Sequence, residues 1–571
     1  MNRRGSAPFR RRLGVLVPAG LVVAGSVAVA VPSGSAAAAA ASGSTRAGGP
    51  IGPGPAGGYT PSDLAVAYGY HPAVSRSGQT VAVVAWGDDP HIAADLGHFD
   101  TQNGYRRETA VSFRKVNQAG KNSPLPPAST GRVDGAAIAT EVEAARGVCN
   151  TCRLLLVEAT SATGHNIAAA ENTAVRLGAT EVANVYAEPE KAEPAGVLAA
   201  FRHPGVVITA PSGDDGWWGW DFANQSSTPT PAQEAPDFPA SDPDVISVGG
   251  TGLELNNDAT IQEQFVWNED GVDDRAGTAN STFGDATGGG CSKQFSASPW
   301  QKANSGYAGA QCGGKRLSAD VSAVGDPATG FDVYDTWGAG DTGWKTLGGT
   351  ALGTAIVAAM YALEGGAAGA AYPGAAIYEN AARHPADVDD IVNTNDGPAS
   401  GNGFCGGDTT ANCGNYVSAN FSGGHSSPNA LGAGDIDCSF PLNGTDPAAP
   451  PPLSSACNAV PGLDGPSGVG TPASAALFAP TNPKVAVSRP KAITARKAAA
   501  FSVRVTPRLS GTTVKRVTVN WGDHRSTTGT SRHVRHTYRK NGHYTVTVTV
   551  IDSLGQQTIA SLPVTVRKSM R

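Results

Sequence analysis

The 571-residue sequence has few charged residues, few aromatic residues and only 3 methionines. After its first 31 residues it contains no apolar run long enough to cross a bilayer, which argues against a membrane span in the rest of the chain. It also lacks a Gly-x-Ser-x-Gly motif, and His98, His165 and His203 have no sequence context that pairs them with a serine. These absences exclude a hydrolase of the nucleophile-elbow type and give no support to a histidine-based triad.

The first residues have the pattern of an export signal. Five arginines between Arg3 and Arg12 precede an apolar run over 13–31, and small residues follow around 33–42. That order is typical of a secretory signal peptide, although a retained membrane anchor remains the alternative because the run is at the short limit for a span. We expect 1–41 to be a signal peptide, and the protein to be secreted and extracellular.

Eight cysteines in an exported chain indicate disulfides. Cys149 and Cys152 lie between a helix pattern and a strand pattern, where a local disulfide is favoured over a redox or zinc site. Cys291 and Cys312 flank one loop region, so we expect them to pair. The sequence does not give the connectivity of the other four, Cys405, Cys413, Cys438 and Cys457.

Composition divides the rest of the chain into two domains. Residues 42–58 are rich in Gly, Ser and Pro and are expected to be a flexible linker. Residues 59–480 form a large domain, and 481–497 are rich in Pro, Lys and Ala, as in a second linker. Alternating strand patterns then predict an all-β domain over 498–571.

The large domain alternates strands with helices. Its strands are almost continuously apolar, which is typical of strands buried on both faces of a parallel sheet. The expected strands are 79–86, 153–157, 180–186, 206–210, 245–250 and 331–335, and the expected helices are 135–147, 167–177, 193–201 and 350–363. This order predicts an α/β fold with a doubly wound parallel sheet.

The stretch 347–360 has the pattern by which subtilisin-like α/β peptidases present a nucleophile. Gly348, Gly349 and Thr350 precede an apolar, Ala-rich run that can continue as a buried helix. Glycine permits a tight turn, and the next side chain projects from a helix N-terminus, where free N–H groups favour developing negative charge. That side chain belongs to Ala351, which has no nucleophilic atom.

The same stretch resembles the Gly-Thr-Ser-x-x-x-Pro signature of the sedolisins, the secreted serine-carboxyl peptidases. Further phrases similar to that family follow in the same order over roughly 59–478. They are Tyr59-Thr60-Pro61, Asp88-Asp89-Pro90, the segment 154–159, Ser212-Gly213-Asp214, Val248-Gly249-Gly250-Thr251 and the segment 317–323. The resemblance implies a subtilisin-like fold and, for an intact member, acid peptidase activity.

In that family a Glu and an Asp four residues apart on one helix act as general base and orienting partner, and a second Asp stabilises the oxyanion when protonated. The resemblance places the Glu position at Ala137 and the Asp position at Glu141. It places the oxyanion position at Asp214 and the serine position at Ala351. Of these four catalytic positions, only Asp214 keeps the family residue.

Other positions depart from the family as well. Ala319 and Ala355 replace prolines, and Ala187 replaces a glycine that lets a substrate backbone approach. Thr350 and Thr354 are the nearest hydroxyls, but one belongs to the turn and the other lies a helical turn further in. We expect neither to act as nucleophile.

Two functions follow from this pattern. The first is a catalytically inactive homologue that binds peptide, protein or polymer. The alternative is an active acid serine-type endopeptidase with rearranged catalytic residues. Trp217, Trp218 and Trp220 follow the Ser-Gly-Asp phrase and could form a ligand platform, although packing of a loop onto the domain explains them equally well.

The resemblance also implies a structural calcium ion, Ca²⁺, near the end of the large domain. Asp390 and Asp464 would supply carboxylate oxygens, and Ile391, Val460 and Gly462 would supply carbonyl oxygens. An insertion over about 414–455 separates the two parts of this pattern.

The final domain resembles the PKD (polycystic kidney disease) module, an immunoglobulin-like β-sandwich. Trp521-Gly522-Asp523, His536-Thr537-Tyr538 and Gly542-His543-Tyr544 carry the resemblance. Residues 484–571 hold 17 Lys and Arg against 2 Asp and Glu, so we expect an anionic partner such as a cell-wall polymer. A nucleic-acid partner is not expected for an exported protein.

Overall fold

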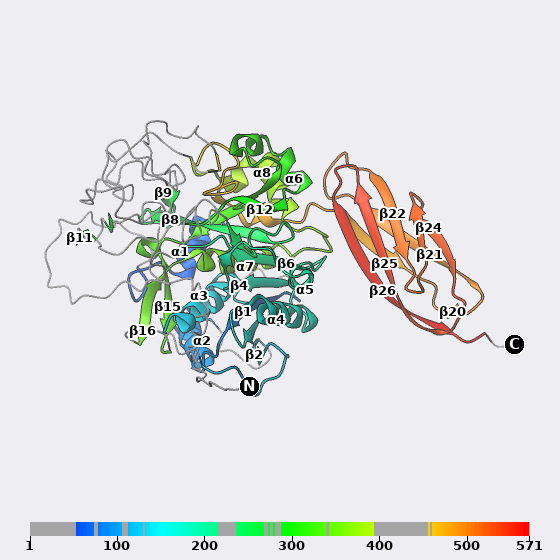
Figure 1. The fold of residues 1–571 in the computed structure, drawn as a ribbon, viewed down its shortest axis with the longest axis horizontal. Helices are drawn as coiled ribbons and strands as arrows, with labels where there is room; N and C mark the ends of the chain where they lie inside the picture. The colour runs from blue at the N-terminus through cyan, green and yellow to red at the C-terminus, as the bar shows by residue number, and fades with distance from the viewer. Residues whose placement is uncertain are drawn as a thin grey trace, which may run out of the picture.

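The computed structural model describes residues 53–72, 78–105, 112–128, 132–214, 236–267, 272–273, 278–279, 287–337, 342–392, 455–456 and 459–569. Within these ranges a large α/β unit is followed by a separate β-sandwich (Figure 1). The expected signal peptide, Trp217, Trp218, Trp220 and the last four cysteines lie outside the described residues. No described helix is both long enough and apolar enough to span a membrane.

A parallel sheet forms the centre of the large unit, as the strand–helix alternation predicts. Its strand order is β14-β8-β6-β4-β1-β3-β2, and β9 pairs antiparallel with β8. The strands are β1 (Thr80–Trp86), β2 (Phe113–Asn117), β3 (Arg153–Ala159), β4 (Glu181–Asn184), β6 (Val207–Pro211), β8 (Ile246–Leu255), β9 (Ile261–Val266) and β14 (Val321–Val324). All residues of β1, β4, β6 and β14 are buried, which accounts for the apolar runs in β1 and β6.

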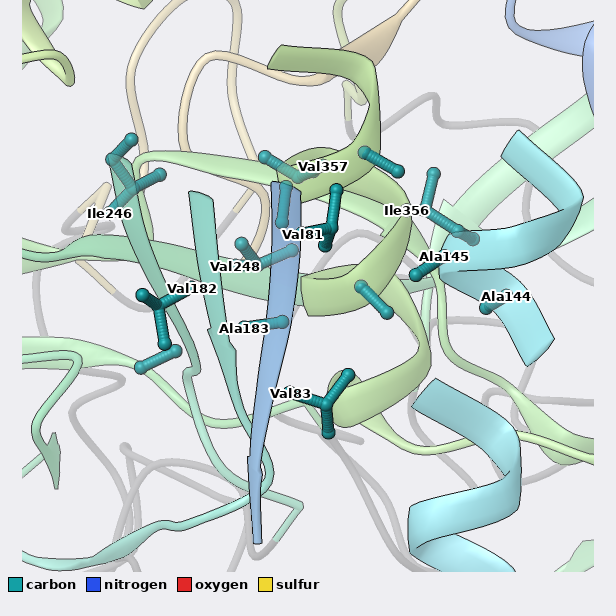
Figure 2. Close-up of a cluster of buried hydrophobic side chains, with 14 of the residues drawn as sticks. Val81, Val83, Ala144, Ala145, Val182, Ala183, Ile246, Val248, Ile356 and Val357 are labelled. Carbon is teal, nitrogen blue, oxygen red and sulfur yellow. The ribbon is translucent and has the colours of Figure 1, made fainter. Parts of the chain in front are cut away.

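Eight α-helices occur in the described part of the large unit. They are α1 (Pro61–Ala67), α2 (Ile92–Gln102), α3 (Arg132–Val148), α4 (Gly164–Arg176), α5 (Ala195–Ala200), α6 (Pro299–Ala303), α7 (Thr350–Leu363) and α8 (Ala375–Arg383). Every residue of α7 is buried, so this helix has no solvent face. A side-chain carbon at Gly353 of α7 would lie 3.2 Å from Val248 of β8, and Figure 2 shows Ile356 of α7 turned toward Ala145 of α3. Helix α7 is therefore held between the sheet and α3.

Short strand pairs surround this core. They are β5 (Glu188–Pro189) with β7 (Asp237–Phe238), β10 (Val272–Asp273) with β11 (Thr278–Ala279), β12 (Gly290–Ser296) with β13 (Lys315–Ser318), β15 (Phe331–Asp335) with β16 (Gly343–Leu347), and β17 (Val388–Asp389) with β18 (Thr471–Pro472). Disulfides join Cys149 to Cys152 and Cys291 to Cys312, which confirms both expected pairings. These disulfides fit an extracellular protein.

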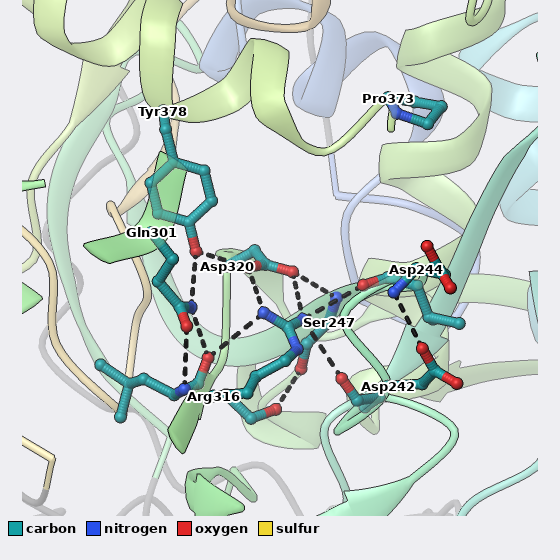
Figure 3. Close-up of polar contacts among 12 residues, drawn as sticks. Asp242, Asp244, Ser247, Gln301, Arg316, Asp320, Pro373 and Tyr378 are labelled. Carbon is teal, nitrogen blue, oxygen red and sulfur yellow. Dashed lines mark hydrogen bonds and ion pairs between the residues drawn. The ribbon is translucent and has the colours of Figure 1, made fainter. Parts of the chain in front are cut away.

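A buried ion pair fixes the connections into β8 and β14. The Arg316 guanidinium donates to both carboxylate oxygens of Asp320 at 2.8 and 2.6 Å, and to the carbonyls of Ala240 and Val245 (Figure 3). Tyr378 of α8 also donates to Asp320. Because Arg316 and Asp320 are both almost fully buried, each charge depends on the other for compensation.

The C-terminal unit is a β-sandwich of a three-stranded and a five-stranded sheet, in the orders β19-β21-β24 and β20-β26-β25-β22-β23. Its strands are β19 (Lys484–Ser488), β20 (Ile493–Thr494), β21 (Ala498–Thr506), β22 (Val514–Asn520), β23 (Ser526–Gly529), β24 (His533–Thr537), β25 (Gly542–Asp552) and β26 (Gln557–Arg567). Trp521 and Tyr538 are fully buried in its core. The fold class predicted for this domain is confirmed.

Both linker expectations need correction. The range 481–497 contains β19 and β20, because its Lys-Val-Ala-Val-Ser run alternates inward apolar and outward residues and pairs with β21. Its Pro and Lys content concealed this short strand. In the range 42–58, residues 53–58 pack on the large unit, where the Gly58 amide donates to Asp332 at 2.9 Å.

Candidate functional site

The site centres on the N-terminus of α7. Gly349 is the N-cap residue and has a φ of 93°, which favours glycine. A side-chain carbon at this position would also lie 3.1 Å from Oδ2 of Asp214. The turn therefore brings the free amides of the first turn of α7 beside this carboxylate. Ala351, the second residue of the helix, is 5% exposed and carries only a methyl group.

Asp214 follows β6 and is held by the first residue of α7. Its Oδ1 accepts the Thr350 amide at 2.8 Å and the Thr350 hydroxyl at 2.6 Å. Its Oδ2 is buried and has no hydrogen-bond partner among the described residues. Burial raises the pKa of Asp214, and the two bonds from Thr350 oppose that rise. The raised pKa favours the protonated carboxyl, and Oδ2, which has no partner among the described residues, is the oxygen that can carry the proton.

The two nearby hydroxyls are engaged. Thr350 is fully buried and donates to Asp214 or to the carbonyl of Gly213, which lies 3.2 Å away. Thr354 is also fully buried and donates to the carbonyl of Thr350 at 2.9 Å. A nucleophilic hydroxyl must be exposed to the substrate carbonyl. Because both threonine hydroxyls are buried, neither is placed to act as a nucleophile. The Thr350–Asp214 contact was not anticipated from the sequence.

Helix α3 carries the other two expected positions. Ala137 and Glu141 are one helical turn apart, and Ala145, which lies near Ile356 of α7 in Figure 2, is one turn further. These three residues therefore share the side of α3 that packs on α7. Glu141 is fully buried, neither of its carboxylate oxygens has a partner among the described residues, and burial raises its pKa well above the usual range.

The expected substrate strand follows β4. Ala187 is 5% exposed, so its methyl group is enclosed where the family glycine would leave room for a peptide. The preceding Tyr186 packs edge-on against Trp86, with ring centroids 6.4 Å apart.

The structure brings the expected calcium residues together. Asp464 is fully buried and accepts hydrogen bonds from the Val460 amide at 3.0 Å and from Ser467 at 2.8 Å. The Gly462 amide donates to Oδ2 of Asp390 at 2.8 Å. Oδ1 of Asp390 is buried without a partner among the described residues. The structure shows Val460 and Gly462 as amide donors, and their use as carbonyl ligands remains a prediction, as it does for Ile391.

Two curated relatives match the large unit. Sedolisin from Pseudomonas sp. (strain 101) is 26% identical over 353 residues, which are 60% of this chain and 56% of sedolisin. Kumamolisin from Bacillus sp. (strain MN-32) is 27% identical over 318 residues, which are 53% of this chain and 51% of kumamolisin. The large unit is a homologue of sedolisin and kumamolisin. The chain spans about half the length of these curated relatives.

A solved structure of Pseudomonas sedolisin shares the fold of the large unit. That structure, a serine-carboxyl proteinase complexed with two molecules of pseudo-iodotyrostatin, aligns with a TM-score of 0.50 and 21% identity. The alignment covers 74% of this chain and 97% of that chain. The PKD domain family model matches residues 480–566. These matches confirm the predicted sedolisin-like fold and PKD domain.

Compared with the chemistry expected of a sedolisin, the site is incomplete. It has a buried carboxyl beside a helix N-terminus, which is the part that would stabilise an oxyanion. At Ala351 and Ala137, the predicted positions of nucleophile and base, it has only methyl groups. The assignment of these positions remains a prediction from the resemblance.

Proposed function

We propose that this protein is a secreted sedolisin homologue that binds extended polypeptide in the cleft beside α7 and does not cleave it. The observation that carries the proposal is Ala351 at the N-terminus of α7, next to Asp214, with both neighbouring threonine hydroxyls buried and engaged. Acyl transfer needs a nucleophile within reach of the substrate carbonyl, and a methyl group cannot attack it.

The alternative is an acid peptidase that uses rearranged residues. The hydrogen bond between Thr350 and Asp214 is the observation that favours it, since it joins a hydroxyl to a carboxylate. Against it stands the complete burial of Thr350. Loss of the nucleophile alone costs about 10⁶-fold in kcat in a serine peptidase, so any residual rate should be very small.

Replacing Ala187 by Gly should strengthen the binding of an unstructured peptide. The change removes the enclosed methyl group at the substrate strand and lets a backbone approach more closely. We expect the affinity to rise several-fold, corresponding to about 1 kcal/mol. Fluorescence anisotropy of a labelled, reduced and alkylated polypeptide measures this, with Ala200→Gly in α5 as the matched control. If both variants and the wild type bind the peptide with equal affinity, the peptide does not bind beside Ala187, and the proposed binding site is wrong.

We also propose a structural calcium ion held by Asp390 and Asp464. Hard cations prefer carboxylate and carbonyl oxygens. Burial raises the pKa of Asp464 well above its usual range, and the charge of the nearby Asp390 adds to that rise. The partnerless Oδ1 of Asp390 supports the fit. The described residues contain no group of three or more His, Cys, Asp or Glu side chains suited to a metal, so backbone carbonyls would have to complete the set.

Calcium should raise the melting temperature of chelator-treated protein by several degrees. At 100 times its dissociation constant a ligand adds about 2.7 kcal/mol to stability. Asp390→Asn should abolish most of the increase, whereas Asp389→Asn, at the adjacent position, should retain it. Magnesium at equal concentration should have little effect. A melting temperature that calcium does not change would reject the site.

For the PKD domain we propose an anionic polymer as partner. Arg504 on β21 and Arg535 on β24 are exposed on the three-stranded sheet. Binding of a polyanion such as lipoteichoic acid should weaken steeply as salt rises from 0.05 to about 0.5 M, because screening shortens the range of these charges. Arg504→Glu with Arg535→Glu should weaken it further. Binding that does not depend on salt, or equal binding of uncharged dextran, would contradict the proposal of an anionic partner.

A further inference from the structure

Lys115 on β2 lies between two carboxylates at one end of the central sheet. Its Nζ is 2.5 Å from Oδ1 of Asp88, which follows β1, and 3.4 Å from Oε1 of Glu158 on β3. Strand β3 is the neighbour of both β1 and β2 in the sheet. The end of β1, the edge strand β2 and the strand between them therefore each contribute one reactive group to what we call the Lys115 cluster, which consists of Lys115, Asp88 and Glu158.

Backbone contacts hold the Lys115 cluster in place. In the register of β2 with β3, Lys115 is two positions from the residue paired with Glu158, so both side chains leave the same face of the sheet. The Asp88 amide donates to the carbonyl of Pro127 at 3.2 Å, and the Asp89 amide donates to Oε1 of Glu158 at 3.3 Å. Lys115 also donates to the carbonyl of Asp89 at 2.7 Å. The sheet and the loop after β1 thus position the amine against the Asp88 carboxylate.

Little water reaches the Lys115 cluster. The side chains of Lys115 and Asp88 are 15% and 14% exposed, and the side chain of Glu158 is fully buried. Lys191 also lies against two carboxylates, but 59% of its side chain is exposed. Removal of water disfavours the charged forms of an amine and a carboxyl group. The neutral forms, which can react with each other, are therefore more accessible at Lys115 than at Lys191.

Glu158 is suited to carry protons within the cluster. Its Oε2 is buried and has no hydrogen-bond partner among the described residues. Burial raises the pKa of Glu158 to about 8, and the charge of Lys115 opposes that rise. A group with such a pKa can both accept and release a proton near neutral pH. The cluster thus brings together an amine, a carboxyl group and a general acid–base.

We propose that Lys115 and Asp88 condense into an intramolecular amide bond, with Glu158 as the catalytic residue. The bond joins Nζ of Lys115 to Cγ of Asp88 and forms once the chain has folded, because the fold brings the two groups into contact. The proposal does not depend on whether the cleft beside α7 binds or cleaves peptides. The alternative is an ion pair that persists without reaction, and the test below distinguishes the two.

The reaction releases one water molecule and needs no other reactant. The Lys115 ammonium gives one proton to the Asp88 carboxylate and, as its N–C bond to Cγ forms, a second proton to the Glu158 carboxylate. Glu158 then returns that proton to the hydroxyl group on Cγ. The C–O bond to this hydroxyl breaks, water leaves and the carbonyl re-forms. An ammonium and a carboxylate thus become an amide and water, and Glu158 is regenerated.

The amide ties the edge of the sheet to its centre. It joins residues 27 positions apart and closes a covalent loop that includes α2. An ion pair is lost when its carboxylate is protonated in acid, whereas an amide does not titrate there. The link therefore keeps β2 attached to β1 under acidic conditions that would break the ion pair.

The test is a peptide map of the full chain after denaturation, reduction of disulfides and digestion with trypsin. The link prevents cleavage after Lys115 and joins its peptide to the peptide that contains Asp88. The branched product is lighter than the sum of the two peptides by one water, about 18 Da, which mass spectrometry detects. We expect this product in most wild-type molecules, together with complete cleavage after the exposed Lys191.

Three variants assign the chemistry to named groups. Lys115→Arg keeps a positive charge and should give no branched peptide. Glu158→Gln keeps the shape of the side chain but cannot carry the proton, so the link should form about 100-fold more slowly. Lys345→Arg is the matched control, because it replaces the lysine of another buried lysine–aspartate pair, with Asp335, and it should form the link as the wild type does.

A wild-type map that contains only unlinked peptides around Lys115 would overturn the proposal, whether or not any variant folds. A link from Lys115 to Glu158 in place of Asp88 would also overturn it. Melting temperatures show which variants are folded. If folded Glu158→Gln forms the link as fast as the wild type, the catalytic role given to Glu158 is wrong.

Discussion

The combined substitutions Ala351→Ser, Ala137→Glu and Glu141→Asp are expected to produce acid peptidase activity where the wild type has none. The first places a hydroxyl at the N-terminus of α7, and the other two restore the predicted base and its orienting carboxylate on the side of α3 that packs on α7. Asp214 is already in place beside Gly349. We expect cleavage of an unfolded protein at least about 10³-fold faster than by the wild type.

The pH dependence of this variant follows from Asp214. Burial raises its pKa, so it stays protonated, and able to donate to an oxyanion, in acid. Activity should therefore fall as pH rises through that raised pKa. Adding Asp214→Asn to the combined variant is the control, because it keeps the shape but cannot reproduce the titration of a carboxyl group. A combined variant that folds and is as inactive as the wild type would show that the assigned positions do not form the site.

Arg316→Met should destabilise the large unit strongly. The substitution removes the guanidinium that bonds both oxygens of Asp320 and leaves a carboxylate buried without compensation. Breaking a buried ion pair from one side costs about 3–5 kcal/mol. Chemical denaturation followed by tryptophan fluorescence, with the PKD transition assigned separately, measures the change in free energy of unfolding.

The Glu379–Arg383 pair supplies a matched control, since it has the same spacing of four residues but is partly exposed. Arg383→Met should cost only about 0–1 kcal/mol, because solvent screens this pair. Adding Asp320→Asn to Arg316→Met should recover part of the lost stability, because it removes the uncompensated carboxylate charge. Equal costs for Arg316→Met and Arg383→Met would contradict the structural role given to Arg316.

Strands β1, β3, β4, β6 and β8 of the central sheet could be predicted because they are largely buried and mostly apolar. Strands β2, β9 and β14 were not predicted, and the strand predicted over 331–335 is β15, which pairs with β16 outside this sheet. The start of α1 also follows a local rule, since Thr60 and Asp63 form a reciprocal capping box. Strand β19 was missed because five residues in a Pro- and Lys-rich segment carry a weak period of two. Its partner β21 is what makes it a strand, and pairing between segments is not visible in local composition.

The sequence predicted only those parts of the site that are formed by residues close together in the chain. The Gly-Gly-Thr turn pointed to the N-terminus of α7, and the Ser-Gly-Asp phrase pointed to Asp214. The hydrogen bond that joins them links residues 136 positions apart, so no local pattern could show it. The same holds for the contact of Lys115 with Asp88, which links residues 27 positions apart.

The most direct measurement is mass spectrometry of a defined, unstructured peptide after incubation with the wild-type chain at several values between about pH 3 and 7. With its predicted base and nucleophile positions occupied by Ala137 and Ala351, the wild-type protein should return only the intact peptide at every pH. Fragments that disappear when Asp214 is changed to Ala would contradict the account and identify the chain as a working peptidase.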